Sequence, residues 1–203
     1  MRKFSLFITV FAVWINFITA IAGEKAETLS NSDAGVIING IRWATRNVDA
    51  PGTFAQNPED AGRFYQWNRR TGLTAIVSVS GWDSSNPANS VWARTNNPCP
   101  EGWRVPTQAE LHSLRSSGRA WTNRNGVNGR LFGTAPNQIF LPAAGFLHYY
   151  DGSQHSVNSF GFYWSSVQSN DGECAIGLVF DGNRANILSF WQSNGFSIRC
   201  VAE

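Results

Sequence analysis

Charged residues are scarce in this chain of 203 residues, where Asp, Glu, Lys and Arg together make up 15%. Aromatic residues reach 13%, so the chain has ample apolar surface to offset its entropy, which excludes a disordered chain. A long coiled coil would need a Glu- and Lys-rich heptad and is excluded too. Arg2 and Lys3 account for the formal net charge of +2, because the other 14 basic residues equal the 14 acidic ones. A chain without a cationic surface binds phosphate backbones poorly, and we expect no nucleic-acid partner.

Cysteine is also scarce, with three residues and no C-x-x-C spacing. Thiolate metal sites need closely spaced ligands, so we predict no metal and no cofactor. Spacing alone leaves all three disulfide pairings open. Cys99 lies between Pro98 and Pro100 in a stiffened loop, and Cys200 lies in a segment that alternates like a strand. We predict a Cys99–Cys200 disulfide, with Cys174 left over as a buried thiol.

Aromatic residues are abundant, with nine Trp and fourteen Phe, which provides the apolar surface for one sizeable domain. The first residues are typical of an export signal: Met1-Arg2-Lys3 precedes a long apolar run that ends in Ala20-Ile21-Ala22. We predict a signal peptide over 1–22, a flexible spacer over 23–35 and the folded domain over 36–203. The protein is then extracellular, on the cell surface or periplasmic, and contacts a membrane only if the signal stays uncleaved as an anchor.

Short-range patterns predict several elements. Asn39-Gly40 lies between two apolar arms and predicts a hairpin. A short helix is expected to begin at Asn57-Pro58 and to carry Phe64, Tyr65 and Trp67. A second helix begins at Thr107, where Thr107 and Glu110 form a capping box, and ends at Gly118. Residues 79–99 are expected to be irregular loop.

The C-terminal third alternates between strand and turn patterns. Turn signals separate five candidate strands, which are 138–141, 162–167, 175–180, 185–190 and 196–201. Their close spacing predicts an antiparallel meander. Helices early and strands late predict an α+β fold, with two short helices, a small twisted antiparallel sheet and long irregular loops.

Five segments that occur in a fixed order carry a family resemblance. They are INGIRWATRNVDAPGTFAQNPEDAGRFYQWNR from Ile38, NPCPEGWRVPTQAEL from Asn97, IFLPAAG from Ile139, YWSS from Tyr163 and GFSIRCVAE from Gly195. Together they resemble the Fibrobacter succinogenes major paralogous domain, a family abundant in exported proteins of gut Bacteroidetes, over 36–203. The resemblance implies a C-type lectin-like fold, in which a cysteine of the first half commonly pairs with one in the last strand, and it leaves the ligand open.

Calcium-dependent sugar binding is not expected, because the two segments nearest to the lectin calcium motifs lack the carboxylates. These segments are Asn86-Pro87-Ala88-Asn89 and Trp164-Ser165-Ser166. The stretch 148–155 is the most diverse in chemistry and falls where a lectin-like fold places its ligand loops. Aromatic rings, a carboxylate and imidazoles suit a sugar's apolar face and hydroxyls. The predicted ligand-binding residues are His148, Tyr149, Tyr150, Asp151 and His155.

Two other interpretations of this stretch are a solvated loop whose tyrosines cover the sheet, and a zinc site from His148, Asp151 and His155. An enzyme is not expected and no catalytic residue is predicted, because the chain has no Ser-His-Asp order and no G-x-S-x-G elbow. Two pairs of carboxylates are the candidates for hydrolysis: Glu59 with Asp60, and Asp171 with Glu173. The first pair is explained by the expected helix N-terminus, and the second lies at a turn.

Three functions therefore stand as hypotheses. The first is an exported module that binds glycan or protein without calcium, and an exposed aromatic cluster at 148–155 would favour it. The second is a structural or adhesive surface protein without a small ligand, and a strand edge that pairs with itself would favour it. The third is a formylglycine-generating type of enzyme, since WRVPTQAEL resembles a helix start of that family. A cleft holding Cys174 with a depressed pKa would favour this third hypothesis.

Overall fold

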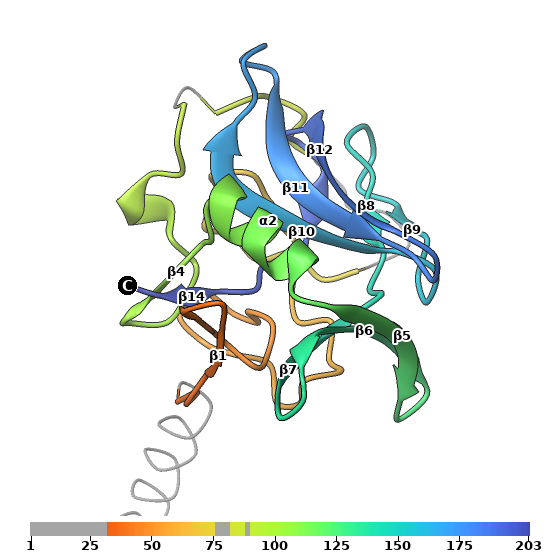
Figure 1. Cartoon of the computed structure of the whole chain (residues 1–203). Coiled ribbons are helices and arrows are strands. Elements are labelled where there is room, and N and C mark those ends of the chain that lie inside the picture. Colours follow the sequence, from red (N-terminus) through yellow and green to blue (C-terminus); the bar gives the residue numbers. More distant parts are fainter. Residues whose placement is uncertain (1–31, 76–81, 88–89) are drawn as a thin grey trace, which may run out of the picture. The chain divides into compact units, whose positions relative to one another are not determined.

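The computed structural model describes residues 32–75, 82–87 and 90–203, and within them Asp33–Glu203 form a compact unit. The predicted signal peptide, 1–22, lies outside the described residues, as do most of the predicted spacer and parts of the predicted loop over 79–99. Figure 1 shows strands packed around one helix, α2 (Gln108–Ser116), and one turn of 3-10 helix occurs at Arg94–Asn96.

Four small antiparallel sheets make up the domain (Figure 1). The first has the order β1 (Val36–Ile38), β2 (Ile41–Trp43), β14 (Val201–Ala202) and β4 (Trp103–Arg104). The second has the order β10 (Gly161–Gln168), β11 (Cys174–Phe180) and β12 (Ala185–Trp191). The third has the order β3 (Tyr65–Gln66), β13 (Gly195–Phe196), β8 (Phe146–Leu147) and β9 (Gln154–His155). The fourth has the order β5 (Arg119–Arg124), β6 (Val127–Thr134) and β7 (Asn137–Pro142).

The predicted α+β, C-type lectin-like fold with two short helices is wrong. The protein is mostly β-sheet, with 40% strand and 7% helix, and a single α-helix occurs in the described residues. The helix expected from Asn57 does not form. Asp60 instead accepts a hydrogen bond from the backbone N–H of Asn57 at 2.8 Å and closes a turn. Gly62 then adopts a φ of 64°, which ends any helical path.

The residues after this turn are buried on both sides of an extended chain, and not on one helical face. Phe64, Tyr65 and Trp67 are all buried, and β3 forms among them. A second error concerns β5 and β6, whose hairpin was not predicted. Asn125-Gly126 carries its turn, with φ angles of 49° and 85°, and is the same signal that predicted the first hairpin.

Other local predictions are confirmed. The hairpin at Asn39-Gly40 joins β1 to β2, with positive φ angles of 51° and 80° at the turn. Both halves of the capping box form at α2: Thr107 accepts from the Glu110 N–H at 3.3 Å, and Glu110 accepts from the Thr107 N–H at 2.7 Å. The meander of β10, β11 and β12 is antiparallel throughout. The predicted strand 196–201 is instead divided between β13 and β14.

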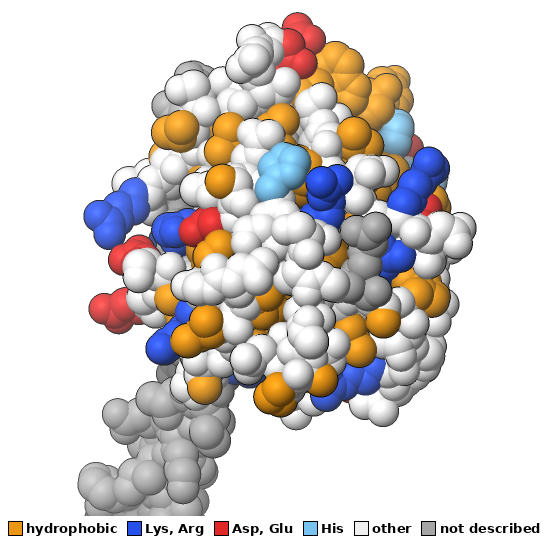
Figure 2. Space-filling view, in the orientation of Figure 1, with side chains coloured by type: hydrophobic (Ala, Val, Ile, Leu, Met, Phe, Trp, Pro, Cys, Tyr) orange, Lys and Arg blue, Asp and Glu red, His pale blue; other side chains and the backbone are white. Residues whose placement is uncertain are grey.

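Surface charge is sparse, as the composition predicts. Figure 2 shows scattered blue and red side chains on this face, separated by polar and hydrophobic ones. Two cations of the described residues are instead buried in the domain, Arg130 at 3% exposed and Arg199 at 1%. The more deeply buried of the two is Arg199. It donates to Asn47 Oδ1 at 2.8 and 3.0 Å and to the carbonyl oxygens of Phe140 at 3.0 Å and Ala44 at 3.3 Å. Burial lowers the pKa of Arg199, because the low-dielectric interior disfavours its charge.

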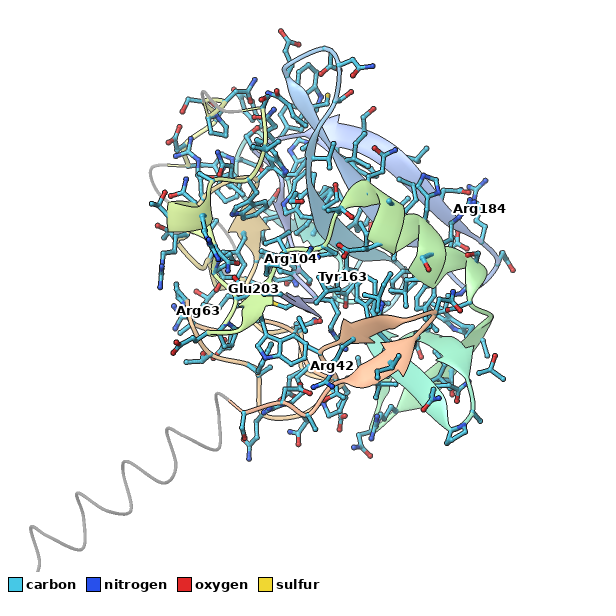
Figure 3. The ribbon with its side chains drawn as sticks, turned by 60° about the vertical axis from the view of Figure 1, so that its left-hand side comes forward. Arg42, Arg63, Arg104, Tyr163, Arg184 and Glu203 are labelled. Atoms are coloured by element: carbon cyan, nitrogen blue, oxygen red, sulfur yellow. A yellow bond between two sulfur atoms is a disulfide. The ribbon has the colours of Figure 1, made fainter. Side chains whose placement is uncertain are left out.

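Tyr163 extends the network around this arginine. Its hydroxyl donates to the Pro142 carbonyl at 3.0 Å and lies 3.3 Å from Asn47 Nδ2. Figure 3 shows Tyr163 in the interior of the molecule. Burial raises the pKa of Tyr163 to about 12, so the phenol keeps its proton as a donor. Arg199 and its partners thereby tie the last segment of the chain to β7 and to the loop after β2.

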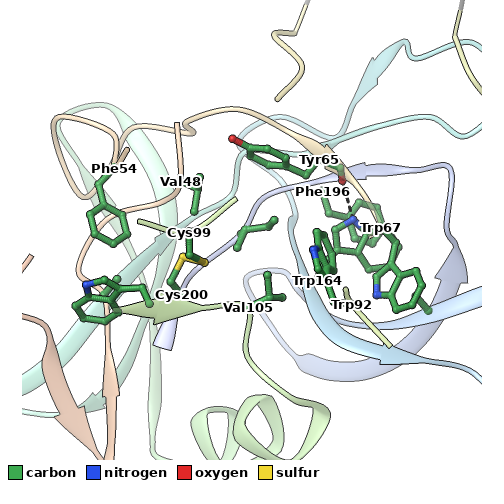
Figure 4. Close-up of a cluster of buried hydrophobic side chains, with 14 residues drawn as sticks. Val48, Phe54, Tyr65, Trp67, Trp92, Cys99, Val105, Trp164, Phe196 and Cys200 are labelled. Carbon is green, nitrogen blue, oxygen red and sulfur yellow. Dashed lines mark hydrogen bonds between the residues drawn. A yellow bond between two sulfur atoms is a disulfide. The ribbon is translucent and has the colours of Figure 1, made fainter. Parts of the chain in front are cut away.

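The predicted disulfide is confirmed: Cys99 bonds to Cys200. Both cysteines lie in a hydrophobic cluster with four buried tryptophans, of which Trp67, Trp92 and Trp164 gather near Phe196 (Figure 4). Trp164 stacks on Phe196 with ring centroids 4.1 Å apart. A second cluster lies between α2 and the sheets, and includes Leu111 and Leu114 of the helix.

The start of the described chain is held by one carboxylate. Asp33 has a side chain only 2% exposed and accepts hydrogen bonds from the N–H groups of Gly35 at 2.8 Å and Thr45 at 2.9 Å. The Thr45 hydroxyl also donates to it at 2.9 Å. Asp33 therefore fastens the entry of the chain to the turn that follows β2.

Over the described residues, no helix combines the length and the apolar character needed to span a membrane. The disulfide is compatible with an exported protein.

Candidate functional site

The turn between β8 and β9 carries most of the predicted ligand-binding residues, and it is held in place. The N–H of His148 donates to Ser153 O at 2.8 Å, and the N–H of Gly152 donates to His148 O at 2.9 Å. Gly152 has a φ of 69° and lies against the ring of Trp82, where a Cβ would come within 2.4 Å of a ring carbon. Trp82 in turn donates its indole N–H to Tyr149 O at 2.8 Å.

The structure brings four of the five predicted residues together. The rings of His148 and Tyr149 lie 4.4 Å apart, and those of His148 and His155 lie 5.5 Å apart. Asp151 Oδ1 lies 3.6 Å from His148 Nδ1. Tyr150 extends into solvent from the same turn and is 76% exposed.

Trp191 was not predicted and completes the surface. It lies at the end of β12, is 45% exposed, and its ring centroid is 6.0 Å from that of Tyr149, which is 38% exposed. A tryptophan just beyond a predicted strand, followed by the polar run Gln-Ser-Asn, was the available signal. We name Tyr149, Tyr150 and Trp191 the aromatic surface. Figure 2 shows hydrophobic side chains gathered at the upper right, over β12 and the β8–β9 turn.

A continuous set of rings supports the aromatic surface from below. Phe146 lies 6.4 Å from His148 and 5.7 Å from His155 between ring centroids. Its other face packs against Phe162 at 4.7 Å, and Phe162 packs against Phe196 at 5.0 Å in the main core. Because the turn rests on core rings, its exposed rings are positioned before any ligand arrives.

Asp151, Ser153 and His155 form a chain of contacts with the residue types of a catalytic serine site. Ser153 Oγ donates to Asp151 Oδ1 at 2.6 Å and lies 2.9 Å from His155 Nε2. The hydroxyl has one proton, so His155 must donate to Ser153 Oγ while Asp151 accepts from it. In this arrangement the serine proton points toward Asp151 and away from the imidazole. The hydrogen bond from Ser153 also lowers the pKa of Asp151, which keeps the carboxylate charged.

Neither the zinc hypothesis nor the hypothesis of a reactive thiol is supported. Among the described residues no group of three or more His, Cys, Asp and Glu side chains is arranged to hold a metal ion. Burial, with Asp171 and Glu173 nearby, raises the pKa of Cys174 to about 11. The formylglycine-generating hypothesis required the opposite shift, and Cys99 is already in the disulfide.

The paired carboxylates serve the fold. Asn125 donates a hydrogen bond that lowers the pKa of Glu59, while Asp60 closes the turn at Asn57. Asp171 accepts from the N–H groups of Cys174 at 2.8 Å and Glu173 at 2.9 Å. Glu59, Asp60 and Asp171 therefore each stabilise local structure.

A separate open hollow of about 450 Å³ lies beside β4 and the start of α2, with Trp92 and Val105 among its lining residues. Arg104 pairs with Glu110 at 2.7 Å, and Arg94 pairs with Glu203 at 3.3 Å, so both cations in its wall are neutralised. Figure 3 shows Arg104 and Glu203 on the same side of the molecule. The hollow therefore offers no net charge for an anion.

A scan against protein-family models and searches of curated proteins and of solved structures find no match. The segments that carry the family resemblance lie mainly in the core and bind one another. Trp67 donates to Ser165 O at 2.9 Å, and Trp164 donates to Tyr65 O at 2.7 Å. These segments account for how the chain folds, whereas the aromatic surface lies outside them.

Proposed function

We propose that the protein is an exported module that binds a glycan on the aromatic surface without calcium. The observation that supports this proposal is the contact between two exposed rings, Tyr149 and Trp191, beside the charged carboxylate of Asp151. Clusters of exposed aromatic rings mark sites of interaction, because removing their apolar surface from water is favourable in free energy.

The chemistry of the surface suits a sugar ring. The C–H face of a pyranose is apolar and can lie on Tyr149 and Trp191, while its hydroxyls need hydrogen-bond partners at the rim. Asp151 accepts such bonds, and His155 offers an imidazole within the same turn. Because hydrogen bonds and core rings hold the turn, binding orders few additional groups and loses little entropy.

The family assignment is part of the same proposal. Five segments in a fixed order support membership of the Fibrobacter succinogenes major paralogous domain family. The export signal over 1–22 supports a location outside the cytoplasm, where surface glycans and surface proteins are the available partners. The disulfide is compatible with that location.

A glycan array tests the proposal directly. The protein from Gly23 to Glu203 is applied to a broad array once with calcium and once with a chelator. We expect binding that survives the chelator. Binding that requires calcium would contradict the metal-free mechanism, and no binding to any glycan would leave the structural or adhesive role as the better explanation.

Variants test whether the aromatic surface is the site. Tyr149→Ala and Trp191→Ala should each weaken glycan affinity by at least about tenfold, because each removes one stacking ring. Tyr149→Phe keeps the ring and should retain most of the affinity. Ile37→Ala, at an exposed position on β1, is the control for a general surface change. Unchanged affinity in both alanine variants would place the binding site elsewhere.

A further inference from the structure

Among the described residues, β12 is the last strand of its sheet, and no strand of this part of the chain pairs with its outer edge. The sheet order is β10-β11-β12, so β12 has one neighbour, and Figure 3 shows it at the margin of the sheet. With seven residues it is longer than β1, β3, β4 and β9, which end the first and third sheets. The edge lies apart from the hollow beside β4.

The hydrogen bonds at the two ends of β12 show which backbone groups face outward. Asp181 N–H donates to Arg184 O at 3.0 Å, and Gln192 N–H donates to Glu173 O at 3.4 Å. Residues 184 and 192 therefore face β11. Because an antiparallel strand alternates, the N–H and C=O groups of Ala185, Ile187, Ser189 and Trp191 face away from β11. Within the described chain, no hydrogen bond takes up the outward groups of Ile187 or Ser189.

The other long edges are protected in ways that β12 is not. β5 ends in the charged Arg124, and β7 ends in Pro142, which cannot donate a ladder hydrogen bond. The outer side of β10 is covered by bridges from Val91 and Ser197. β12 has the sequence ANILSFW, without charge or proline, and Leu188 at its centre is 49% exposed.

We propose that β12 pairs antiparallel with β12 of a second copy of this chain, around a two-fold axis at Leu188. Leu188 is the middle residue of the strand, so this register uses the whole length of both copies. It places Ile187 opposite Ser189 and joins their outward backbone groups, while the two Leu188 side chains meet at a non-hydrogen-bonded pair. Two three-stranded sheets thereby become one continuous sheet.

The side chains favour a second copy as the occupant. In this register the small Ala185 lies opposite the large Trp191 at each end. No charged residue occurs between Ala185 and Ile198, so identical strands meet without repulsion. Arg184 lies opposite Gln192 of the second copy, and its charge is already paired with Asp181 of its own chain at 3.6 Å. The ends of the paired strands therefore also meet without repulsion between like charges.

A hollow beside Leu188 adds an apolar contact. Phe160, Val179 and Phe190 are among the residues that line it, together with Leu188 itself. Directly opposite residues of an antiparallel pair lie on the same face of the sheet. The Leu188 side chain of the second copy therefore lies next to this hollow. The contact is small compared with a typical interface of about 1,600 Å², so we expect a dimer that dissociates on dilution.

Sedimentation velocity over a range of concentrations tests the dimer. The wild-type protein should shift from monomer to dimer as concentration rises. Leu188→Lys should remain monomeric, because two lysines would face each other across the axis, whereas Ile37→Lys adds the same charge on β1 and should still dimerise. A thermal melt establishes that both variants fold. A wild-type protein that stays monomeric, or a dimer that survives Leu188→Lys, would overturn the proposal.

Cross-linking tests the register. In a Cys174→Ser background, Leu188→Cys places two thiols opposite each other at the axis and should give a disulfide-linked dimer under mild oxidation. Ser189→Cys is the matched control, because its opposite residue is Ile187 and the two introduced thiols lie on separate sides of the axis. Equal cross-linking of both variants would refute the register. Neither experiment uses a ligand, so the dimer can fail while glycan binding holds, and the reverse. A dimer found together with an empty glycan array would favour the structural or adhesive hypothesis.

Discussion

Removing the Cys99–Cys200 disulfide should cost a large part of the stability of this domain. The bond closes a loop with a sequence separation of 101 residues, so it restrains most of the folded chain when that chain unfolds. In the chain-entropy model, a loop of this length corresponds to about 4.7 kcal/mol. The double variant Cys99→Ala/Cys200→Ala removes the bond without leaving a reactive thiol.

The burial of the two sulfur atoms adds to this loss of stability. Both cysteines lie in the tryptophan-rich cluster, and replacing sulfur by hydrogen leaves a small space there, at a cost of roughly 1 kcal/mol. A total near 5–6 kcal/mol compares with a stability of about 5–15 kcal/mol for a typical domain. We therefore expect the double variant to be marginally folded at room temperature.

Urea unfolding followed by tryptophan fluorescence measures this difference. The free energy of unfolding is compared between the wild type, the double variant and Cys174→Ala. The last variant removes the thiol outside the disulfide, and its free energy of unfolding should stay within about 1 kcal/mol of the wild type. A loss below about 2 kcal/mol in the double variant would refute the reasoning. Peptide mapping that links Cys174 to another cysteine would refute it as well.

Three further predictions concern stability and pH. Urea unfolding should show that Arg199→Met lowers the free energy of unfolding by about 3 kcal/mol or more, because Asn47 Oδ1 and the Phe140 carbonyl lose their donor. Arg199→Lys should recover only part of the lost stability. Thr107→Ala should cost about 1 kcal/mol in the same assay, whereas Thr107→Ser keeps the cap. Cys174 should react with iodoacetamide at pH 8 at least about tenfold more slowly than in the unfolded chain, since its pKa of about 11 keeps the thiol protonated.

The sign of the Cys174 shift also sets a pH dependence of stability. The folded state holds the thiol proton more tightly than the unfolded chain, whose pKa is near 9.0. The resulting stabilisation is fully present below pH 9 and is lost as pH rises toward 11. Urea midpoints of the wild type should therefore fall more than those of Cys174→Ala across this range. If the urea midpoints of the two proteins fell equally with pH, the raised pKa of Cys174 would be contradicted.

Local signals in the sequence predicted local structure well. The Asn-Gly dipeptide at 39–40 and the capping box at Thr107 depend on contacts within a few residues, and both are confirmed. The expected helix after Asn57 failed because its N-terminal signal is equally compatible with a turn. Gly62 and the buried ring of Phe64 decide between the two through contacts with distant segments, and a local pattern does not contain these.

The candidate site was predicted only in part for the same reason. The turn over 148–155 was recognisable by its residue types. Trp191 joins Tyr149 only because β12 ends beside this turn, at a separation of about 40 residues that no local pattern spans. The outward edge of β12 was equally hidden, because it depends on the order of strands in the sheet and not on any motif.

The anchoring of Asp33 has a consequence for how the domain is presented. Asp33 fixes the entry of the chain beside the turn that follows β2, and Figure 1 places β1 at the bottom and β12 with the β8–β9 turn at the upper right. A domain tethered through its N-terminal side would therefore hold the aromatic surface away from the tether. In a dimer paired at Leu188, the two Trp191 residues would lie about 20 Å apart along the joined strands. The two aromatic surfaces of such a dimer would bind two sugars of one glycan chain at once, and the overall affinity would exceed that of either surface alone.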